Sequence, residues 1–237
     1  MLLAGTNIVK IRLVCVVKDG FSNWFPIHRE LIEAILHPGL LVDWHNEESP
    51  LTEIKSLEDA HIAGKHVVHA AQEAQRLGFD AVAVDCLLQP GVKEAREKTT
   101  IPVIGAAEAS LAIALKMGRK PAFVVGGDAE SLEKVIQYLP AAECVVSCVG
   151  VGGSPLDFSA KGDYELVSQR MKQCLSKAIN NGADVIIGYG SLALINELRQ
   201  YSFVPVISPI QAVVLYAEHV VRVHRASKCE VKGQRRR

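Results

Sequence analysis

Long apolar runs are missing from this chain of 237 residues, since no segment approaches the roughly 20 apolar residues that a bilayer-spanning helix needs. An excess of either charge is also missing, because 26 Lys and Arg residues balance 26 Asp and Glu residues. A nucleic-acid surface normally shows a basic excess or stripe. We therefore expect neither a membrane nor a nucleic acid as a partner.

Cysteines are too sparse for a disulfide framework, and a reducing cytoplasm is the expected location. The N-terminal run is apolar but contains Lys10 and Arg12, and it has no charged start or small-residue cleavage site. It predicts a first strand and not a signal peptide. The six cysteines are Cys15, Cys86, Cys144, Cys148, Cys174 and Cys229.

Recognisable metal and dinucleotide motifs are absent as well. Three histidines between residues 61 and 69 share one predicted helix, but no carboxylate or cysteine completes a metal set. Cys144 and Cys148 lie on one predicted strand at a spacing that is not CxxC, which favours packing. The stretch GVGGS at 150–154 lacks GxGxxG spacing and predicts a loop over the cleft. We expect no metal and no cofactor.

What the chain does contain is a regular alternation of short apolar strands and amphipathic helices. The strands carry no internal polar alternation, which is typical of parallel sheets covered by helices on both faces. No linker rich in Pro, Gly or Ser separates the halves. The predicted fold class is therefore α/β, with two pseudo-symmetric lobes, each a short parallel sheet flanked by helices.

An internal repeat supports the two lobes. GFDAVAVDCLLQPGV at 78–92 aligns with GADVIIGYGSLALI at 182–195, and IPVIGAAEASLAIA at 101–114 aligns with VPVISPIQAVVLYA at 204–217. In this register Cys86 falls on Gly190. Ligands of parallel sheets sit beyond the carboxyl ends of the strands, so both positions should face one cleft.

The repeat also suggests the boundaries of the lobes. We expect residues 8–106 plus 208–226 to form the first lobe, which carries Cys86. Residues 107–207 should form the second lobe, which carries Gly190 and Ser191. The basic segment 227–237 is expected to be a disordered tail.

Cys86 is the main candidate for chemistry. Amide dipoles at a strand end that turns into a helix are expected to lower the pKa of its thiol. A thiolate among ordered N–H donors is suited to removing a proton from carbon, while the amides stabilise the resulting enolate. The alternative from periodicity alone is that Cys86 is a small buried apolar residue.

The two repeated segments resemble the catalytic-cysteine segments of the aspartate/glutamate/hydantoin racemase superfamily, nearest to its hydantoin racemase branch. SPLTEIKSLEDA at 49–60 resembles the strand-to-helix segment that precedes the first of them. The resemblance extends over about residues 11–218. It implies a cofactor-independent racemase, often a homo-oligomer, in which one cysteine removes an α-proton and a second returns it from the opposite face. Cys86 matches the first of these cysteines.

The chain departs from the superfamily pattern at the second cysteine, where Gly190 stands. Tyr189 is a possible proton source, although an ordinary phenol is a poor base near neutral pH. Ser191 directly follows Gly190 and is a candidate for binding a substrate carboxylate. The family's N-terminal turn is replaced by VKDGFSN, from which Asp19 or Ser22 is expected to approach the cleft. The substrate-binding candidates are Asp19, Leu87, Gly126, Gly127, Tyr189, Gly190 and Ser191.

Three functions follow from this pattern. The first is proton transfer at an acidic carbon of a small carboxylate or imide substrate such as a hydantoin or an amino acid, with Cys86 as the thiol. The second is a single-cysteine decarboxylase of a malonate-type acid, in which Cys86 protonates one face of an enolate. The third is a binding protein that keeps the cleft without the chemistry.

Overall fold

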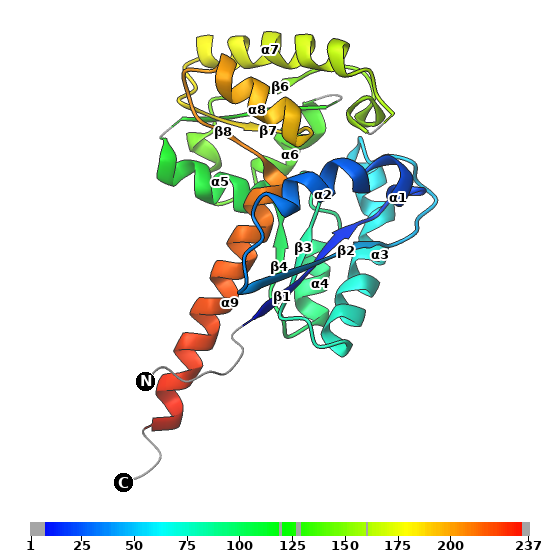
Figure 1. Cartoon of the computed structure of the whole chain (residues 1–237), viewed down its shortest axis with the longest axis vertical. Coiled ribbons are helices and arrows are strands. Elements are labelled where there is room, and N and C mark those ends of the chain that lie inside the picture. Colours follow the sequence, from blue (N-terminus) through cyan, green and yellow to red (C-terminus); the bar gives the residue numbers. More distant parts are fainter. Residues whose placement is uncertain (1–7, 119, 127–128, 160, 234–237) are drawn as a thin grey trace.

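The computed structural model describes residues 8–118, 120–126, 129–159 and 161–233. Two four-stranded parallel sheets, ordered β2-β1-β3-β4 and β6-β5-β7-β8, form two lobes (Figure 1). When the strands of each sheet are numbered in chain order, both sheets have the same strand order, so the two lobes are pseudo-symmetric. The strands are β1 (Val9–Cys15), β2 (Leu40–Asn46), β3 (Ala81–Val84), β4 (Val103–Gly105), β5 (Pro121–Val125), β6 (Ser147–Gly150), β7 (Val185–Gly188) and β8 (Val206–Ile207).

Helices cover both faces of each sheet, as the unbroken apolar strands predict. They include two short 3-10 helices, η1 (Ala142–Cys144) and η2 (Pro155–Phe158). Of the helices in the described part of the chain, none has the length and apolar character needed to cross a bilayer. The α-helices are α1 (Gly20–Asn23), α2 (Phe25–Glu33), α3 (Leu57–Arg76), α4 (Val92–Lys98), α5 (Ala106–Met117), α6 (Glu130–Ile136), α7 (Tyr164–Asn180), α8 (Leu192–Tyr201) and α9 (Pro209–Gly233).

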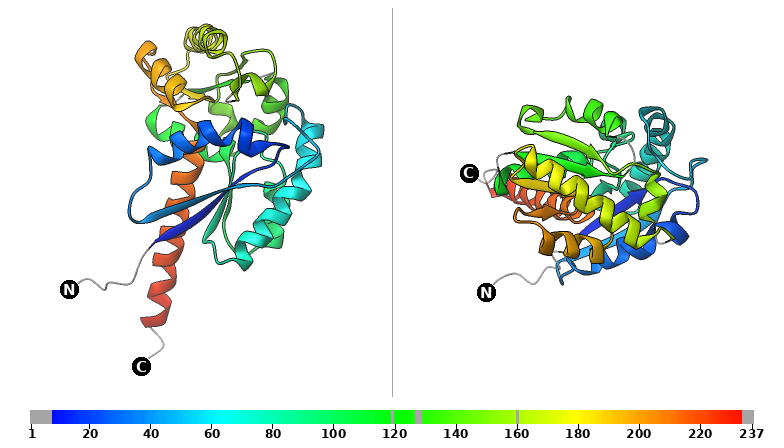
Figure 2. Two further views of the ribbon diagram at one scale, coloured as in Figure 1. Left: turned by 45° about the vertical axis from the view of Figure 1, so that its right-hand side comes forward. Right: turned by 90° about the horizontal axis from the view of Figure 1, so that it is seen from above.

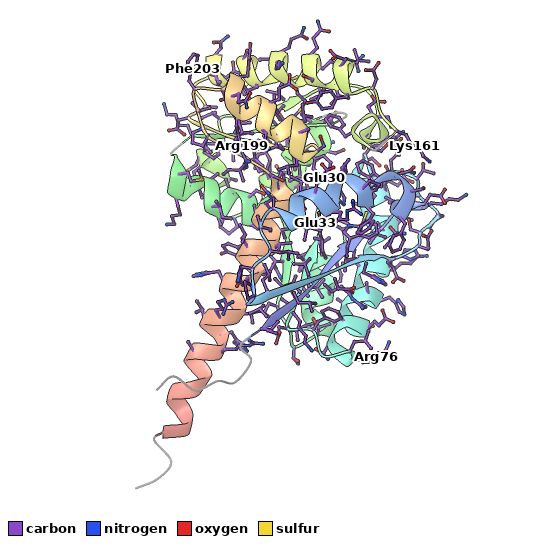
Figure 3. All side chains as sticks on the ribbon, in the orientation of Figure 1. Glu30, Glu33, Arg76, Lys161, Arg199 and Phe203 are labelled. Atoms are coloured by element: carbon purple, nitrogen blue, oxygen red, sulfur yellow. The ribbon has the colours of Figure 1, made fainter. Side chains whose placement is uncertain are left out.

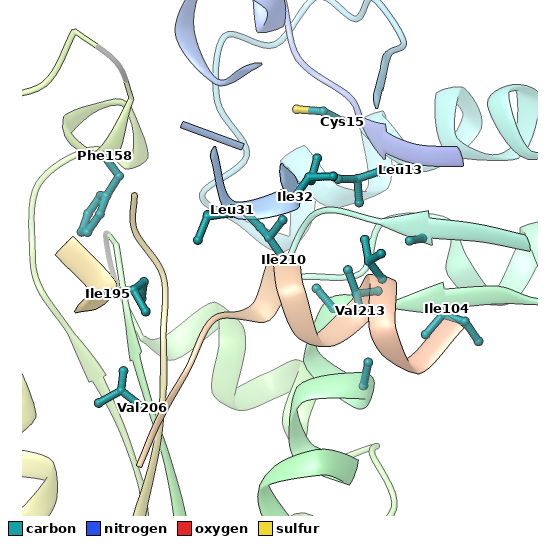
Figure 4. Packing of buried hydrophobic residues seen from close by; sticks show 14 of the residues in the cluster. Leu13, Cys15, Leu31, Ile32, Ile104, Phe158, Ile195, Val206, Ile210 and Val213 are labelled. Carbon is teal, nitrogen blue, oxygen red and sulfur yellow. The ribbon is translucent and has the colours of Figure 1, made fainter. Parts of the chain in front are cut away.

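Alternate residues along the strands of the first sheet pack into two separate hydrophobic cores. Val14 and Val82 face α3 and α4, whereas Leu13 and Ala83 face α9. This arrangement follows from the period of two along a strand. Figure 4 shows the second of these cores, in which Ile210 and Val213 of α9 approach Leu13 and Ile32, while Phe158, Ile195 and Val206 come from the other lobe. The core that contains α9 therefore continues from one lobe into the other.

The repeat predicted from the sequence is present as matched contacts. The carboxylate of Asp80 accepts the backbone N–H of Lys10 at 2.8 Å, and that of Asp184 accepts the N–H of Lys120 at 2.7 Å. The guanidinium of Arg96 donates to the Val103 carbonyl, as that of Arg199 does to Val206.

Two helices at the lobe boundary position the site. Helix α2 lies between the first sheet and the second lobe, with Glu30 and Glu33 exposed on its outer side (Figure 3) and His28 buried on its inner side. Helix α9 packs on α5, β1 and β3 and then extends past the first lobe (Figure 2). His28 is thereby held beside the junction of the lobes.

One local expectation, that Cys144 and Cys148 share a strand, is wrong. Residues 227–233 belong to α9, and Arg225 of this helix forms an ion pair with Asp80 at 2.6 Å. The end of the expected tail, residues 234–237, lies outside the described residues. Cys144 lies in η1 and not on the strand of Cys148, since the chain turns at Ala141 in a left-handed conformation.

Candidate functional site

A cavity of about 120 Å³ lies between the lobes, at the carboxyl ends of the two central strands of each sheet. Its position agrees with the rule that parallel sheets bind ligands at these ends. One wall follows β1 and β3, and the other follows β5 and β7. The lining residues from the first lobe are Cys15, Val16, Val17, Trp24, Ile54, Lys55, Asp85, Cys86, Leu87 and Leu88, and those from the second are Val125, Gly126, Leu132, Pro155, Phe158 and Tyr189.

Cys86 lies in the cavity wall, two residues after β3 ends. Burial raises the pKa of its thiol to about 12, and the nearby Asp85 carboxylate acts in the same direction. The N–H groups of Leu88 and Gln89 interact with the sulfur and lower its pKa, but by less than burial raises it. The amide donors expected from the sequence are therefore present, whereas the expected lowering of the thiol pKa is wrong. Cys86 is a neutral thiol in these surroundings.

Four of the predicted substrate-binding residues lie in or beside the cavity wall. Leu87, Gly126 and Tyr189 line it directly. Gly190 is buried directly after Tyr189, and a Cβ built on it would lie 2.7 Å from Cδ2 of Leu194.

Two of the remaining candidates, Asp19 and Ser191, are not among the lining residues. Asp19 is exposed and adopts a left-handed conformation at the start of α1, where its carbonyl accepts the N–H of Ser22. The hydroxyl oxygen of Ser191 accepts the N–H of Leu194 at 3.2 Å and caps α8. Gly127 lies outside the described residues.

Several wall residues were not singled out from the sequence. Cys15 ends β1, and burial raises its thiol pKa well above the ordinary value. Lys55 lies at the wall with its ammonium group 2.8 Å from Glu53, whose other oxygen accepts the hydroxyl of Ser154. Cys15 has a signal in the sequence, because the first strand of a parallel sheet also ends at the ligand-binding edge.

Behind the wall, a buried set of polar side chains around His28 contacts the lining residues Asp85 and Tyr189. The Nδ1 of His28 lies 2.9 Å from Oδ2 of Asp85, and its Nε2 lies 3.0 Å from the phenol oxygen of Tyr189. The indole Nε1 of Trp44 lies 3.1 Å from the same Nδ1. Burial raises the pKa of the Tyr189 phenol well above its ordinary value, with Asp85 adding to the effect. Like both thiols, this phenol keeps its proton in these surroundings.

The sequence of this chain matches a known protein family. The Asp/Glu/Hydantoin racemase family profile matches residues 27–217. A hydantoin racemase of Pseudomonas sp. (strain NS671) is 25% identical over 173 residues, which make up 71% of this chain and 69% of that protein.

Two solved structures share the fold across both lobes. The allantoin racemase of Pseudomonas fluorescens matches with a TM-score of 0.82 and 21% identity, covering 91% of this chain and 92% of its own. The allantoin racemase of Klebsiella pneumoniae matches with a TM-score of 0.80 and 19% identity, covering 91% and 89%. With its profile match across both lobes, the chain belongs to the Asp/Glu/hydantoin racemase family.

Proposed function

We propose that this protein transfers a proton at an acidic carbon next to a carboxylate, amide or imide group, with Cys86 as the thiol acid/base. The observation that carries the proposal is the position of Cys86 in the wall of the cavity between the lobes, beside two backbone N–H groups. Such donors stabilise the negative charge that develops on sulfur or on an enolate oxygen. Support for the substrate class comes from a hydantoin racemase that matches 71% of the chain and from allantoin racemases whose structures match over 91% of it. We therefore propose a substrate with a hydantoin ring or a similar small imide.

The neutral state of Cys86 fixes the direction of the first transfer at this residue. A thiol with a pKa of about 12 holds its proton at neutral pH and gives it to an enolate after water or another group on the opposite face has taken the α-proton. The thiolate so formed is stabilised by the N–H groups of Leu88 and Gln89. It then serves as a base for the enantiomer whose hydrogen faces Cys86.

The opposite wall has no second thiol among the described lining residues. Gly190 follows Tyr189 as Cys86 follows Asp85, and we propose that it replaces the second catalytic cysteine of the family. We also propose that Lys55, at the wall, pairs with an anionic group of the substrate. A homo-oligomer remains our expectation from the family resemblance.

The test is hydrogen exchange in D₂O, followed by NMR on separate enantiomers of 5-substituted hydantoins, allantoin and α-amino acids, with optical rotation recorded in parallel. We expect exchange with loss of optical rotation in the wild type, and a loss of at least about 100-fold in Cys86→Ala. The matched control is Cys144→Ala, which removes a thiol outside the cavity wall.

Three outcomes are informative. Exchange in the wild type that survives in Cys86→Ala contradicts the role of the thiol. Exchange with retained handedness points to a one-sided acid and makes malonate-type acids the next substrates. Failure of every substrate to exchange, combined with unchanged ligand binding in Cys86→Ala, favours a binding protein.

A further inference from the structure

A carboxylate of the first lobe contacts the second lobe beside the cavity. Glu53 lies in the segment between β2 and α3, and Ser154 lies 101 residues later, directly before η2 (Figure 1). One carboxylate oxygen of Glu53 accepts the ammonium of Lys55 at 2.8 Å, and the other accepts the hydroxyl of Ser154. The Glu53 side chain is only 14% exposed. It therefore holds one group from each lobe.

Glu53 is ionised in these surroundings. Burial raises the pKa of its carboxyl, but hydrogen bonds from Lys55, Ser154 and the backbone N–H of Leu156 lower it, and the net pKa lies below the ordinary value. A carboxylate that accepts charge-assisted hydrogen bonds binds its donors more strongly than a neutral acceptor does. The donors from both lobes are therefore held by the same negative charge.

The first group that Glu53 holds is the one cationic side chain among the described residues that line the cavity, Lys55. Its ammonium has three N–H donors, of which one contacts Glu53. The Lys55 side chain is 60% exposed, so the other donors can reach a ligand. A lysine side chain loses much rotamer freedom when it binds an anion. The contact with Glu53 removes part of that freedom before the substrate arrives, which lowers the cost of binding.

The second group that Glu53 holds is the start of η2. Ser154 is the N-cap of this helix, and its hydroxyl oxygen accepts the N–H of Leu156 at 3.1 Å. Pro155 and Phe158 of the same helix line the cavity. The Phe158 ring packs so closely on Gly126 that a Cβ added to this glycine would lie 2.6 Å from its Cε2. The position of Ser154 thus determines part of the second-lobe wall.

We propose that Glu53 is a positioning residue of the substrate site, which holds Lys55 toward the anionic group of the substrate and holds η2 against the cavity. The proposal rests on the function proposed above, in which Lys55 pairs with that group. Glu53 is not itself among the lining residues, so it acts through Lys55 and Ser154. One carboxylate of the first lobe then shapes both walls of the cavity.

Steady-state kinetics of substrate exchange in D₂O separate this role from a structural one. Glu53→Gln should raise KM by about fivefold or more, with kcat within about twofold of the wild type. A loss of folded protein would instead lower kcat and leave KM unchanged. The matched control is Glu58→Gln, which removes an exposed carboxylate from the first turn of α3 and should change neither constant. An unchanged KM in Glu53→Gln would overturn the proposal, and so would a lower one, which would mean that Glu53 competes with the substrate for the ammonium.

A double-mutant cycle tests whether Glu53 acts through Lys55. Lys55→Met keeps the apolar stem of the side chain and removes its charge. In that background Glu53→Gln should raise KM by less than about twofold, because the ammonium that it positions is gone. An equal rise in KM with and without Lys55 would overturn the proposal.

Amide hydrogen exchange of the free protein gives a readout that does not depend on activity. The N–H groups of Asp157 and Ser159 donate at 3.0 Å and 2.9 Å to carbonyls of η2 and its N-cap. Glu53→Ala should speed the exchange of both amides by about fivefold or more, whereas Glu58→Ala should not. Equal exchange in the wild type and Glu53→Ala would overturn the proposal. A wild type that exchanges no substrate of the panel would defeat the proposed function, while faster amide exchange in Glu53→Ala would still support the hold of Glu53 on η2.

Discussion

The contact between Gly64 and Gly91 holds α4 against α3 and thereby fixes the segment that follows Cys86. Gly91 has a φ of +63°, in the left-handed region, and precedes α4 directly. A Cβ at this position would lie 2.3 Å from the carbonyl oxygen and 2.8 Å from the Cα of Gly64. Those atoms belong to the backbone of α3 and cannot rotate away. Gly91→Ala must therefore push the two helices apart.

The cost can be estimated from two contributions. Placing a non-glycine residue in the left-handed region costs about 1–2 kcal/mol. Forcing extra atoms into a well-packed contact adds about 1–3 kcal/mol. Gly78 separates these contributions, because its φ is +78° but a Cβ added there would have no neighbour within 4 Å. We expect a loss of about 2–5 kcal/mol for Gly91→Ala and about 1–2 kcal/mol for Gly78→Ala.

Urea unfolding monitored by circular dichroism measures both free energies of unfolding. Hydrogen exchange on the proposed substrates should also slow in Gly91→Ala, since the N–H groups of Leu88 and Gln89 precede the displaced residue. Equal destabilisation by the two substitutions would refute the steric part of the reasoning. It would mean that α3 and α4 separate without a measurable cost.

Three further predictions concern charge and titration. Asp80→Asn should lower the free energy of unfolding by about 1–3 kcal/mol in urea, because the carboxylate accepts the Lys10 N–H and pairs with Arg225; a loss below about 0.5 kcal/mol contradicts this. Hydrogen bonds from Lys172, Tyr164 and Ser168 lower the pKa of Glu197 to about 2, so its stabilising contribution is present above the ordinary value of 4.5 and is lost as the pH falls from about 4.5 to about 2. Thermal unfolding of Glu197→Gln should therefore show a smaller loss of Tm over that range than the wild type, and equal losses would refute it. Alkylation of Cys86 by iodoacetamide, measured by peptide mass spectrometry, should rise about tenfold per pH unit from pH 7 to 10, whereas a plateau near pH 7 would contradict its raised pKa.

The sequence predicted the features of this fold that depend on local patterns. The apolar strands and the repeat led to two parallel sheets, and the carboxyl-end rule led to Cys86 and Tyr189 in one cavity. The positive φ values of Gly78 and Gly182, which are +78° and +94°, show that the repeat extends to backbone conformation. Each of these features is set by neighbours in the chain or by strand order.

Features that depend on distant packing were not predicted. His28 looks like an ordinary helix residue in the sequence, and only the docking of α2 between the lobes brings it to Asp85 and Tyr189. The thiol pKa of Cys86 was expected to fall because the N–H donors are local and foreseeable. Its desolvation comes from the whole cavity, and burial outweighs the donors. Burial raises the thiol pKa and the N–H donors lower it, and the relative size of the two effects can be judged only in the folded chain.

The equivalent hydrogen bonds in the two halves, made by Asp80 and Asp184 and by Arg96 and Arg199, have a further consequence. They fasten each half at the amino ends of its strands and along its outer helix, away from the residues that face the cavity. The two positions after β3, Asp85 and Cys86, and the two after β7, Tyr189 and Gly190, take no part in these matched contacts. A duplicated ancestor could therefore diverge at these positions one half at a time. The two lobes can therefore keep the same fold while the residues that face the cavity differ between them.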